Sequence, residues 1–428
     1  MEHPFETALM RIIGQDRVSK LMIHGKPMWI ATPGAIEEVV SLVRLASEYG
    51  KSVAAVGAKK QFDLHRDDEQ VDLWIETAQL CSIIEYSPED MVITVGAGMR
   101  LRDLQNELSN YHQFLPIDPI GGDDETLGSI VAANAWGPSR ALYGTLRDHV
   151  IGTRTVLANG DVVRTGGRVV KNVAGYDLTK LLVGSFGSLG VMVEITFRVR
   201  PLPAQRTAVI LSGSVDDVNH ARAALMDSAL IPSAFECANA PLAHALELSL
   251  GAKDALWLAV GCDEPVEGTA FQESVLREWS LAYSLEFMTL SPEQTSDLWR
   301  GYHHTLRNAD VVLRVQGKPS VLIPLMGALS VTLDGQSVWM SACVPAGVLR
   351  VFFAAGDGTA QDVSSCVSQL SAYEVTLNYE KRPLDHSDYP KLDTPDAASG
   401  AKQTVHRHIY QAFDPAGLFS KTRIGGAK

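Results

Sequence analysis

Paired cysteines are missing from this sequence. Its five cysteines, at positions 81, 237, 262, 343 and 366, are scattered, and none belongs to a CxxC pair. A zinc site or a cysteine-ligated iron–sulfur cluster is read from such paired spacing, so neither is indicated. We expect the cysteines to be small buried side chains in a reducing compartment.

Positive charge and long apolar runs are also scarce. The chain carries 37 Lys and Arg against 50 Asp and Glu, a net charge of −13. This balance argues against a general nucleic-acid surface and against an anionic membrane face, so any anion site must be local. The start "MEHPFETALMRIIGQDR" does not read as a signal peptide, and no run approaches the ~18 apolar residues of a membrane span.

A nicotinamide fingerprint is absent as well. The piece "GAGMRL" at residues 96–101 lacks the third glycine of GxGxxG, and no acidic residue follows at the expected distance. We therefore interpret it as a plain turn.

What the chain does have is 428 residues that are 46% apolar, enough to bury the cores of two or three domains.

The region from residue 28 to 57 predicts a helix followed by a strand. Thr32 is positioned to cap a helix with Pro33 in its first turn, and Gly50 ends it. The run "SVAAV" predicts a short buried strand that ends at Gly57. A strand that ends on glycine is a place where backbone amides meet a phosphate.

A second anion site is predicted at Thr126, which is positioned to cap a short helix. The free amides of Leu127, Gly128 and Ser129 would then face an anion, with no side chain at Gly128 to block it. The alternative is a tight loop packed on a neighbouring helix.

Residues 153–199 predict a hairpin and a long strand. Alternating runs flank Asn159-Gly160, which suits a type I′ turn. Alternate residues from Val191 to Val199 are apolar, as in a half-buried strand. The glycines before it would make tight turns, whereas the nearby cations, Arg168, Lys171 and Lys180, either face an anion or form a solvated surface.

Beyond residue 205, strand-like and helical runs alternate. They include "TAVILSG", "DALWLAVG", "VVLRVQG" and "SVWMSACV", and helices such as "VDDVNHARAALMDSA". This texture predicts an α+β layer in which helices cover an antiparallel sheet. Arg314 and Arg350 fall on predicted strands, where each faces either a cleft or the solvent; they are the weak catalytic candidates. The pair His303-His304 lies on a predicted helix and is expected at the surface.

Three stretches carry a family resemblance: "TLGSIVAANAWGPSRALYGTLRDHVIG", "GRVVKNVAGYDLTKLLVGSFGSLGVMVEITFRVRPLP" and "FDPAGLF". They resemble the FAD-binding domain of the vanillyl-alcohol oxidase and p-cresol methylhydroxylase (PCMH) superfamily, and most of all the FAD-binding subunit of bacterial glycolate oxidase. The resemblance implies an α+β chain with four parts: a 1–27 extension, a two-subdomain PCMH-type FAD-binding domain at 28–204, an α+β cap with an antiparallel sheet at 205–385, and a linker and returning segment at 386–428.

The resemblance also implies site residues for a non-covalent FAD. The pyrophosphate loop would comprise Gly57, Ala58, Lys59, Lys60, Gln61 and Phe62. Further contacts would come from Pro119, Thr126, Leu127, Gly128, Ser129, Ala132 and Asp148, and from Gly190, Val191 and Ile195 where backbone approaches the cofactor. No histidine in the 57–62 loop offers a covalent link, and no metal site is expected.

The implied function is that of an FAD-binding subunit in a glycolate or 2-hydroxy-acid dehydrogenase complex. Its partners would be a catalytic flavin subunit and an iron–sulfur subunit, in the cytoplasm or held by partners at the inner face of the membrane. Two alternatives remain open: a self-sufficient FAD-dependent alcohol or hydroxy-acid dehydrogenase, and a flavin-free scaffold. The scaffold is suggested by the loop "VGAKKQFD", which has one glycine where relatives have several.

Overall fold

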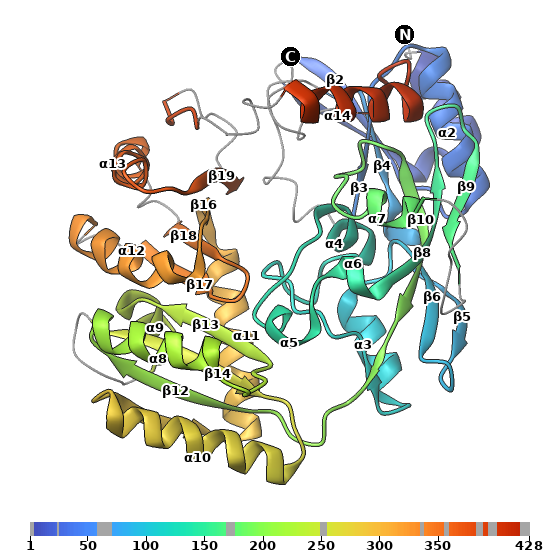
Figure 1. The fold of residues 1–428 in the computed structure, drawn as a ribbon. Coiled ribbons are helices and arrows are strands. Elements are labelled where there is room, and N and C mark those ends of the chain that lie inside the picture. The colour runs from blue at the N-terminus through green and yellow to red at the C-terminus, as the bar shows by residue number, and fades with distance from the viewer. Residues whose placement is uncertain are drawn as a thin grey trace.

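The protein is described from a computed structural model that covers residues 4–23, 25–57, 71–167, 176–248, 255–333, 338–354, 359–381, 388–392 and 400–419. Figure 1 shows two groups of elements side by side, one built from the first 200 residues and one from residues 207–381. The chain is mixed helix and sheet, and the group at residues 207–381 carries an antiparallel sheet, as the sequence predicts.

The first sheet has four strands in the order β1-β2-β4-β3. Their bounds are β1 Val18–Ile23, β2 Lys26–Ala31, β3 Val53–Val56 and β4 Leu73–Glu76, and the helices beside them are α1 Pro4–Ile13 and α2 Ile36–Glu48. The segment predicted as an extension thus contributes a helix and a strand, and β1 pairs with β2 along its whole length. The apolar side chains of both helices share one core with Trp29.

Helix α2 begins later than the sequence predicts. Its first residue is Ile36 and its N-cap is Ala35, which makes no side-chain cap bond. Thr32 instead donates its hydroxyl hydrogen bond to Glu76 Oε2 at 3.0 Å. The Thr32 side chain, which the local sequence predicts to cap the helix, therefore bonds to Glu76 of another strand instead.

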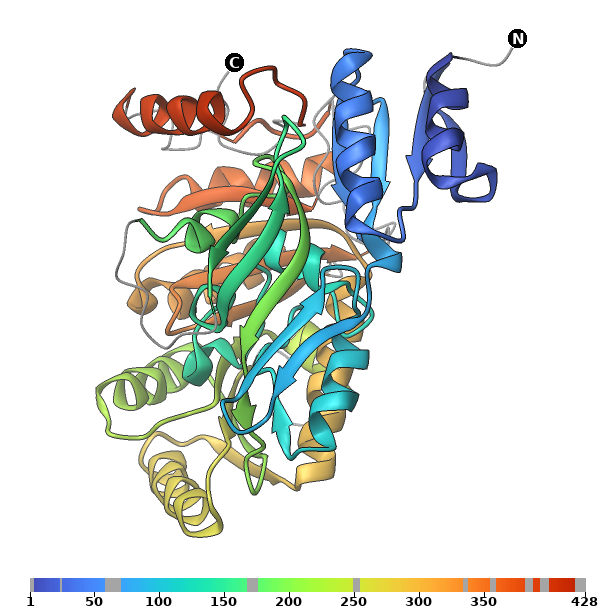
Figure 2. The same cartoon turned by 90° about the vertical axis from the view of Figure 1, so that its right-hand side faces the viewer.

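The second sheet is antiparallel, in the order β5-β6-β10-β8-β9. Its strands are β5 Ile83–Ser87, β6 Val92–Gly96, β8 Val150–Val156, β9 Val162–Gly166 and β10 Val191–Arg198. Around it lie α3 Leu101–Ser109, α4 Leu127–Ala133, α5 Arg140–Tyr143, α6 Leu146–His149, α7 Leu178–Leu182 and the two-strand pair β7 Gln113–Phe114 with β11 Arg200–Pro201. Figure 2 shows β10 running through the middle of this group.

Strand β10 is not the one-faced strand that its alternation predicts. The pairing with β8 shifts between Met192 and Glu194. Val191 and Val193 therefore join one core, whereas Met192, Ile195 and Phe197 join another. A bulge of this kind changes which side chains face each side of the sheet.

The predicted hairpin exists, but with a different turn. Gly160 has φ 78°, and its amide donates to Leu157 O at 2.9 Å. Asn159 is not among the residues with positive φ, which a type I′ turn requires at both central positions. Its side-chain oxygen instead accepts from the Asp161 amide at 2.9 Å.

The third sheet has eight antiparallel strands in the order β15-β12-β14-β13-β17-β18-β16-β19. Their bounds are β12 Thr207–Gly213, β13 Ala234–Ala238, β14 Leu256–Cys262, β15 Glu286–Leu290, β16 Ala309–Gln316, β17 Val338–Cys343, β18 Val348–Ala354 and β19 Thr376–Lys381. The helices of this group are α8 Val215–Asp227, α9 Ala240–Ala245, α10 Val266–Ala282, α11 Pro292–Arg307, α12 Pro319–Thr332 and α13 Ala360–Leu370.

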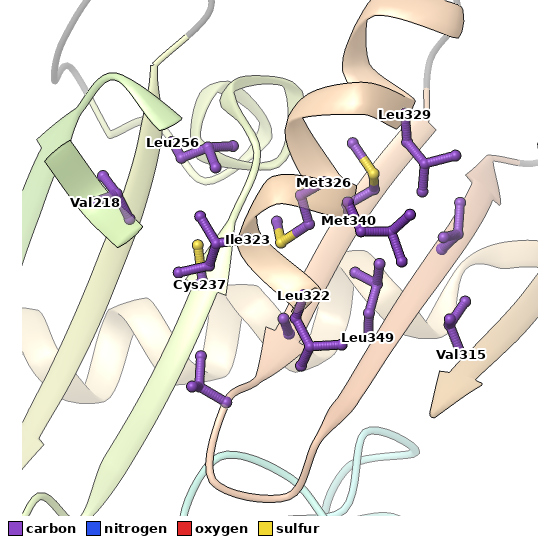
Figure 3. Close-up of a cluster of buried hydrophobic side chains, with 14 of the residues drawn as sticks. Val218, Cys237, Leu256, Val315, Leu322, Ile323, Met326, Leu329, Met340 and Leu349 are labelled. Atoms are coloured by element: carbon purple, nitrogen blue, oxygen red, sulfur yellow. The ribbon is translucent and has the colours of Figure 1, made fainter. Parts of the chain in front are cut away.

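One face of the eight-stranded sheet is covered by α8, α10, α12 and α13 and carries a large apolar core. Figure 3 shows part of this core, in which Leu322 and Met326 of α12 lie over Met340 and Leu349 of the sheet. The opposite face packs on α9 and α11 for part of its width. Four of the five cysteines are buried, and Cys81 is exposed.

The C-terminal segment crosses to the first sheet. Helix α14 (Gly400–Phe413) leads to Phe419, which makes a parallel bridge with Val53 of β3, and the Val53 amide donates to Leu418 O at 2.8 Å. The Asp414 carboxylate accepts from the amides of Leu418 and Phe419, both at 2.8 Å. The tail is thus fixed against β3.

Candidate active site

The end of β3 makes close contact with the start of α4. A Cβ at Gly57 would lie 2.0 Å from Thr126 Oγ1, so no larger residue fits there without displacement. Thr126 caps α4, as predicted, by accepting from the Ser129 amide at 3.4 Å. The Ser129 hydroxyl lies 3.1 Å from Glu125 Oε2. Positions 58–62 of the predicted pyrophosphate loop lie outside the described residues.

The prediction of free amides at the start of α4 is wrong. The Leu127 amide donates to Met99 O at 2.8 Å, and the Gly128 amide donates to Ala97 O at 2.7 Å. A Cβ at Gly128 would lie 2.9 Å from Ala97 O. The glycine therefore serves close packing of α4 on the 96–99 turn, a packing role rather than an anion-binding one, although it lies in a helix and not in the tight loop of the alternative.

The predicted turn at residues 96–101 has a similar packing role. A Cβ at Gly98 would lie 1.9 Å from Thr77 O, and the Gly98 amide donates to Leu80 O at 2.8 Å. These contacts join the 77–80 segment after β4 to the strand β6. Glycine is needed here for close approach between the first and second sheets.

The other predicted FAD contacts are spread over the second sheet and its helices. Asp148 caps α6, where Oδ2 accepts from the Thr145 amide at 2.8 Å, and this bond lowers the pKa of its carboxyl. Pro119 is buried and accepts from the Gly122 amide at 2.8 Å, and Ala132 O accepts from the Phe186 amide at 2.9 Å. The remaining three lie on or beside β10: Val191 and Ile195 are buried in apolar cores, and Gly190 has φ 150°.

The glycines before β10 make the tight turns that the sequence predicts. Gly184 and Gly187 have φ of 83° and 74°, and the Gly184 amide donates to Val131 O at 3.0 Å. A Cβ at Gly187 would lie 3.7 Å from Ala55 Cβ. The segment therefore lies between α4 and β3, so three chain segments meet at one place. Lys180 donates to Val150 O at 3.1 Å, which ties the stretch to β8.

Asn134 at this junction was not predicted from the sequence. It ends α4 in the left-handed conformation, with φ 48°, and its buried Oδ1 has no hydrogen-bond partner among the described residues. A buried acceptor without a partner calls for a donor. A ring N–H of a flavin is a donor of this kind, so the junction fits the cofactor that the resemblance implies.

A row of polar side chains crosses the second face of the eight-stranded sheet. Ser341 of β17, Arg350 of β18 and Arg314 of β16 stand directly opposite one another in the strand register. Glu236 of β13 stands opposite Cys343, two residues along β17. Residues opposite one another in an antiparallel pair share a face, so these side chains form one strip, which we call the polar row.

Trp136 lies over the middle of the polar row. The Arg350 Cζ atom is 4.0 Å from the centre of its ring, and the Arg140 Cζ atom is 4.3 Å from it. Trp136 also packs in an apolar cluster with Cys343 and Val348. The polar row thus faces the group built from the first 200 residues, and Arg350, one of the two catalytic candidates, lines this contact.

Three arginines, Arg140, Arg314 and Arg350, lie within electrostatic range of one another near Trp136. Arg350 pairs with Glu380 at 2.7 Å, and Arg314 approaches the same carboxylate at 3.7 Å. Arg314 Nε is buried without a hydrogen bond, and Arg140 makes no ion pair with a described residue. Burial lowers the pKa of Arg140 and Arg314. Arg350 and Arg314 share the Glu380 carboxylate, and planar guanidinium groups with free N–H donors favour an anionic ligand that offers planar oxygen pairs.

A separate cavity of about 750 Å³ lies between the 113–124 segment and α11. Asp118 in its wall accepts from the Ser139 amide at 2.9 Å, and burial raises the pKa of Asp118 to about 7. His303 Nε2 is 4.0 Å from the Asp118 carboxylate, and its side chain is only 15% exposed. The surface position expected for this histidine is therefore wrong, whereas His304 is exposed.

Trp136, Arg140, Glu236 and Ser341 were not predicted as site residues. A signal for Glu236 exists in "SAFECANA", where a single carboxylate interrupts an apolar run. The others carry no local signal, because they become neighbours only when α5 and the sheet meet. Among the described residues, no helix is long and apolar enough to cross a membrane.

Comparison with known proteins identifies the class of protein. Residues 27–166 match the family model described as FAD binding domain. An FAD-linked oxidoreductase of Mycobacterium tuberculosis is 30% identical over 430 residues, which covers 94% of this chain and 91% of that protein. The chain therefore belongs to the family of FAD-linked oxidoreductases that carry this domain. These relatives are FAD-linked oxidoreductases, which supports an FAD-dependent enzyme over the flavin-free scaffold.

Matches to proteins of named activity are shorter. A mitochondrial D-lactate dehydrogenase of Arabidopsis thaliana is 30% identical over 53% of this chain and 42% of its own length. Glycolate oxidase subunit GlcE of Escherichia coli is 44% identical over 28% of this chain and 35% of its own length. The chain thus spans less than half the length of these relatives. A solved alkyldihydroxyacetonephosphate synthase shares the fold, with a TM-score of 0.72 over 98% of this chain and 84% of that one at 15% identity.

Proposed function

We propose that this chain is the FAD-binding subunit of a 2-hydroxy-acid dehydrogenase complex of the glycolate oxidase kind. It passes electrons from the hydroxy acid through its flavin to a partner that holds iron–sulfur clusters. The observation that carries the proposal is the group of arginines near Trp136, where Arg140 has no ion pair with a described residue and the buried Arg314 Nε has no hydrogen bond. Local identity to a glycolate oxidase subunit supports the assembly into a complex.

In this proposal, the two groups of elements have separate tasks. Residues 28–204 hold FAD where β3, α4 and the 184–190 turn meet, with Asn134 Oδ1 accepting a hydrogen bond from it. Residues 205–385 cover the flavin, and the tail from 386 returns to the first group. Bound FAD would supply the two-electron acceptor for the substrate. Arg350, fixed by Glu380 and by the face of Trp136, would bind the substrate carboxylate through its two parallel N–H donors.

A spectrum and a reduction assay test this function. We expect the purified protein to be yellow, and its flavin absorbance to bleach on addition of a 2-hydroxy acid such as glycolate or lactate under argon. The matched alcohols with a methyl group in place of the carboxylate, ethanol and 2-propanol, should have no effect. Bleaching by these alcohols as readily as by the acids would contradict the carboxylate site.

A second experiment separates the complex from a self-sufficient dehydrogenase. We expect the chain, co-expressed with the other subunits of its complex, to co-purify with protein-bound iron, and turnover with an artificial acceptor to rise strongly over the chain alone. Full turnover by the isolated chain with no gain from partners would favour the self-sufficient alternative.

A further inference from the structure

A carboxyl group is buried at one end of the polar row without a cation bonded to it. Glu236 is 2% exposed, and its Oε2 accepts from the Ser341 hydroxyl at 2.8 Å and from the Tyr302 hydroxyl at 3.3 Å. The two hydroxyl oxygens lie 2.7 Å apart. Tyr302 and Ser341 are themselves buried, at 1% and 3% exposure. Two hydroxyls and a carboxyl in mutual contact form a closed network through which a proton can move.

This cluster is expensive for the fold to keep. A carboxyl group in an apolar surrounding destabilises a protein unless it is paired or neutral, and apolar residues of similar size would pack as well. The groups facing Glu236 are Tyr302 from α11, Cys343 from β17, Arg350 from β18 and Asp118 from the 113–124 segment. Burial raises the pKa of Glu236, whereas the hydroxyl bonds and Arg350 lower it.

The position of the cluster connects it to the proposed carboxylate site. Ser341 stands directly opposite Arg350 in the register of β17 and β18, on the same face. A 2-hydroxy acid carries its hydroxyl on the carbon next to the carboxylate. A substrate carboxylate on Arg350 therefore places the reacting hydroxyl within one side chain's reach of Ser341.

We propose that Glu236, Ser341 and Tyr302 are the proton-accepting group of this enzyme. The inference rests on the function proposed above. Bound FAD would supply the acceptor for the hydride of the C2–H bond, so oxidation of the hydroxy acid to the 2-oxo acid would leave the hydroxyl proton for the protein to accept. The hydroxyl proton passes to Ser341 Oγ while the Ser341 proton passes to the Glu236 carboxylate. Tyr302 is a positioning residue that fixes the direction of both bonds.

Infrared titration of the purified protein tests the carboxyl group without relying on activity. A protonated carboxyl in an apolar site gives a resolved C=O stretching band that shifts in D2O. We expect such a band to titrate above the ordinary range of glutamate and to be missing in Glu236→Gln. Absence of any band that this variant removes would overturn the proposal.

The pH dependence of flavin reduction tests the role in catalysis. The carboxylate must be ionised to accept a proton, so the rate should fall as pH drops through the pKa of Glu236. We expect Glu236→Gln to lose that limb and to reduce the rate about 100-fold or more, with little change in KM. Tyr302→Phe removes a donor that stabilises the carboxylate, so the limb should move to higher pH by roughly half a unit or more.

The outcomes distinguish this inference from the function on which it rests. If no 2-hydroxy acid reduces the wild-type flavin, the proposed function fails. If the wild-type flavin is reduced and Glu236→Gln keeps the same acidic limb, only the proton-accepting group is overturned. Flavin content and circular dichroism establish folding of each variant, and Tyr302→Phe carries the test if Glu236→Gln does not fold.

Discussion

The two faces of the eight-stranded sheet come from the same strands and have opposite chemistry. Each polar row residue stands next to a core residue in sequence: Glu236 beside Cys237, Met340 beside Ser341, and Leu349 beside Arg350. The core face in Figure 3 is closed by helices, whereas the polar row meets Trp136 from the other half of the molecule. One strand thus contributes to stability on one side and to ligand chemistry on the other, with a period of two residues.

The largest effect on stability is expected from the core face. Leu349→Ala removes a fully buried side chain and should lower the free energy of unfolding by about 3 kcal/mol. Urea denaturation monitored by tryptophan fluorescence measures this change. The folded variant should keep the wild-type KM, and a large rise in KM would show that the two faces are not independent.

A substitution on the polar face should change kcat/KM strongly and the free energy of unfolding little. Arg350→Lys keeps a positive charge but loses the two parallel donors, and we expect kcat/KM for a 2-hydroxy acid to fall about 100-fold, or roughly 3 kcal/mol. The unfolding free energy should change far less than in Leu349→Ala. Arg300→Lys, at an exposed pair with Asp297, is the matched control and should leave kcat/KM unchanged.

A pH effect is expected from Asp118, which interacts electrostatically with Glu236. Its pKa in the folded chain, about 7, lies above the ~3.9 of an unfolded aspartate. The folded state therefore binds the extra proton, and stability falls as pH rises from about 4 to about 7. Because its side chain is 26% exposed, we expect this contribution to be ~2 kcal/mol.

Thermal unfolding between pH 4.5 and 7.5 measures the Asp118 effect. Asp118→Asn should flatten the decline in Tm, whereas Asp297→Asn, at an exposed carboxylate, should not. A decline that is identical in wild type and Asp118→Asn would contradict the assignment.

The smallest effect is expected at the more exposed end of the polar row. The Arg314 side chain is 32% exposed, against 7% for Arg350. Water therefore weakens the interaction of Arg314 with a bound ligand. Arg314→Lys should lower kcat/KM roughly tenfold, near 1.4 kcal/mol. An effect equal to that of Arg350→Lys would mean that both arginines bind the carboxylate together.

Much of this structure could be predicted from local patterns in the sequence. Strand-like apolar runs predicted strands of the large sheet, Thr126 predicted the cap of α4, and apolar flanks marked Arg314 and Arg350. Positive φ at Gly184 and Gly187 was likewise readable from residue type. These features depend on neighbours within a few positions, which is the information that a single sequence holds.

The predictions that the structure contradicts concern residues whose contacts lie far away in the sequence. The Leu127 and Gly128 amides were expected to be free because Met99 O and Ala97 O, which accept from them, lie some 30 positions upstream. His303 was expected at the surface because its neighbours in sequence do not indicate that it packs beside Asp118 in the folded chain. The bulge in β10 divides one apolar pattern between two cores, and no residue type in that strand signals it.

The bridge between Val53 and Phe419 has a consequence for biosynthesis. During translation, β3 leaves the ribosome more than 300 residues before the segment that closes its edge. The contact between Val53 and Phe419 therefore cannot form until the ribosome has made residue 419, so this part of the first sheet is completed late in folding.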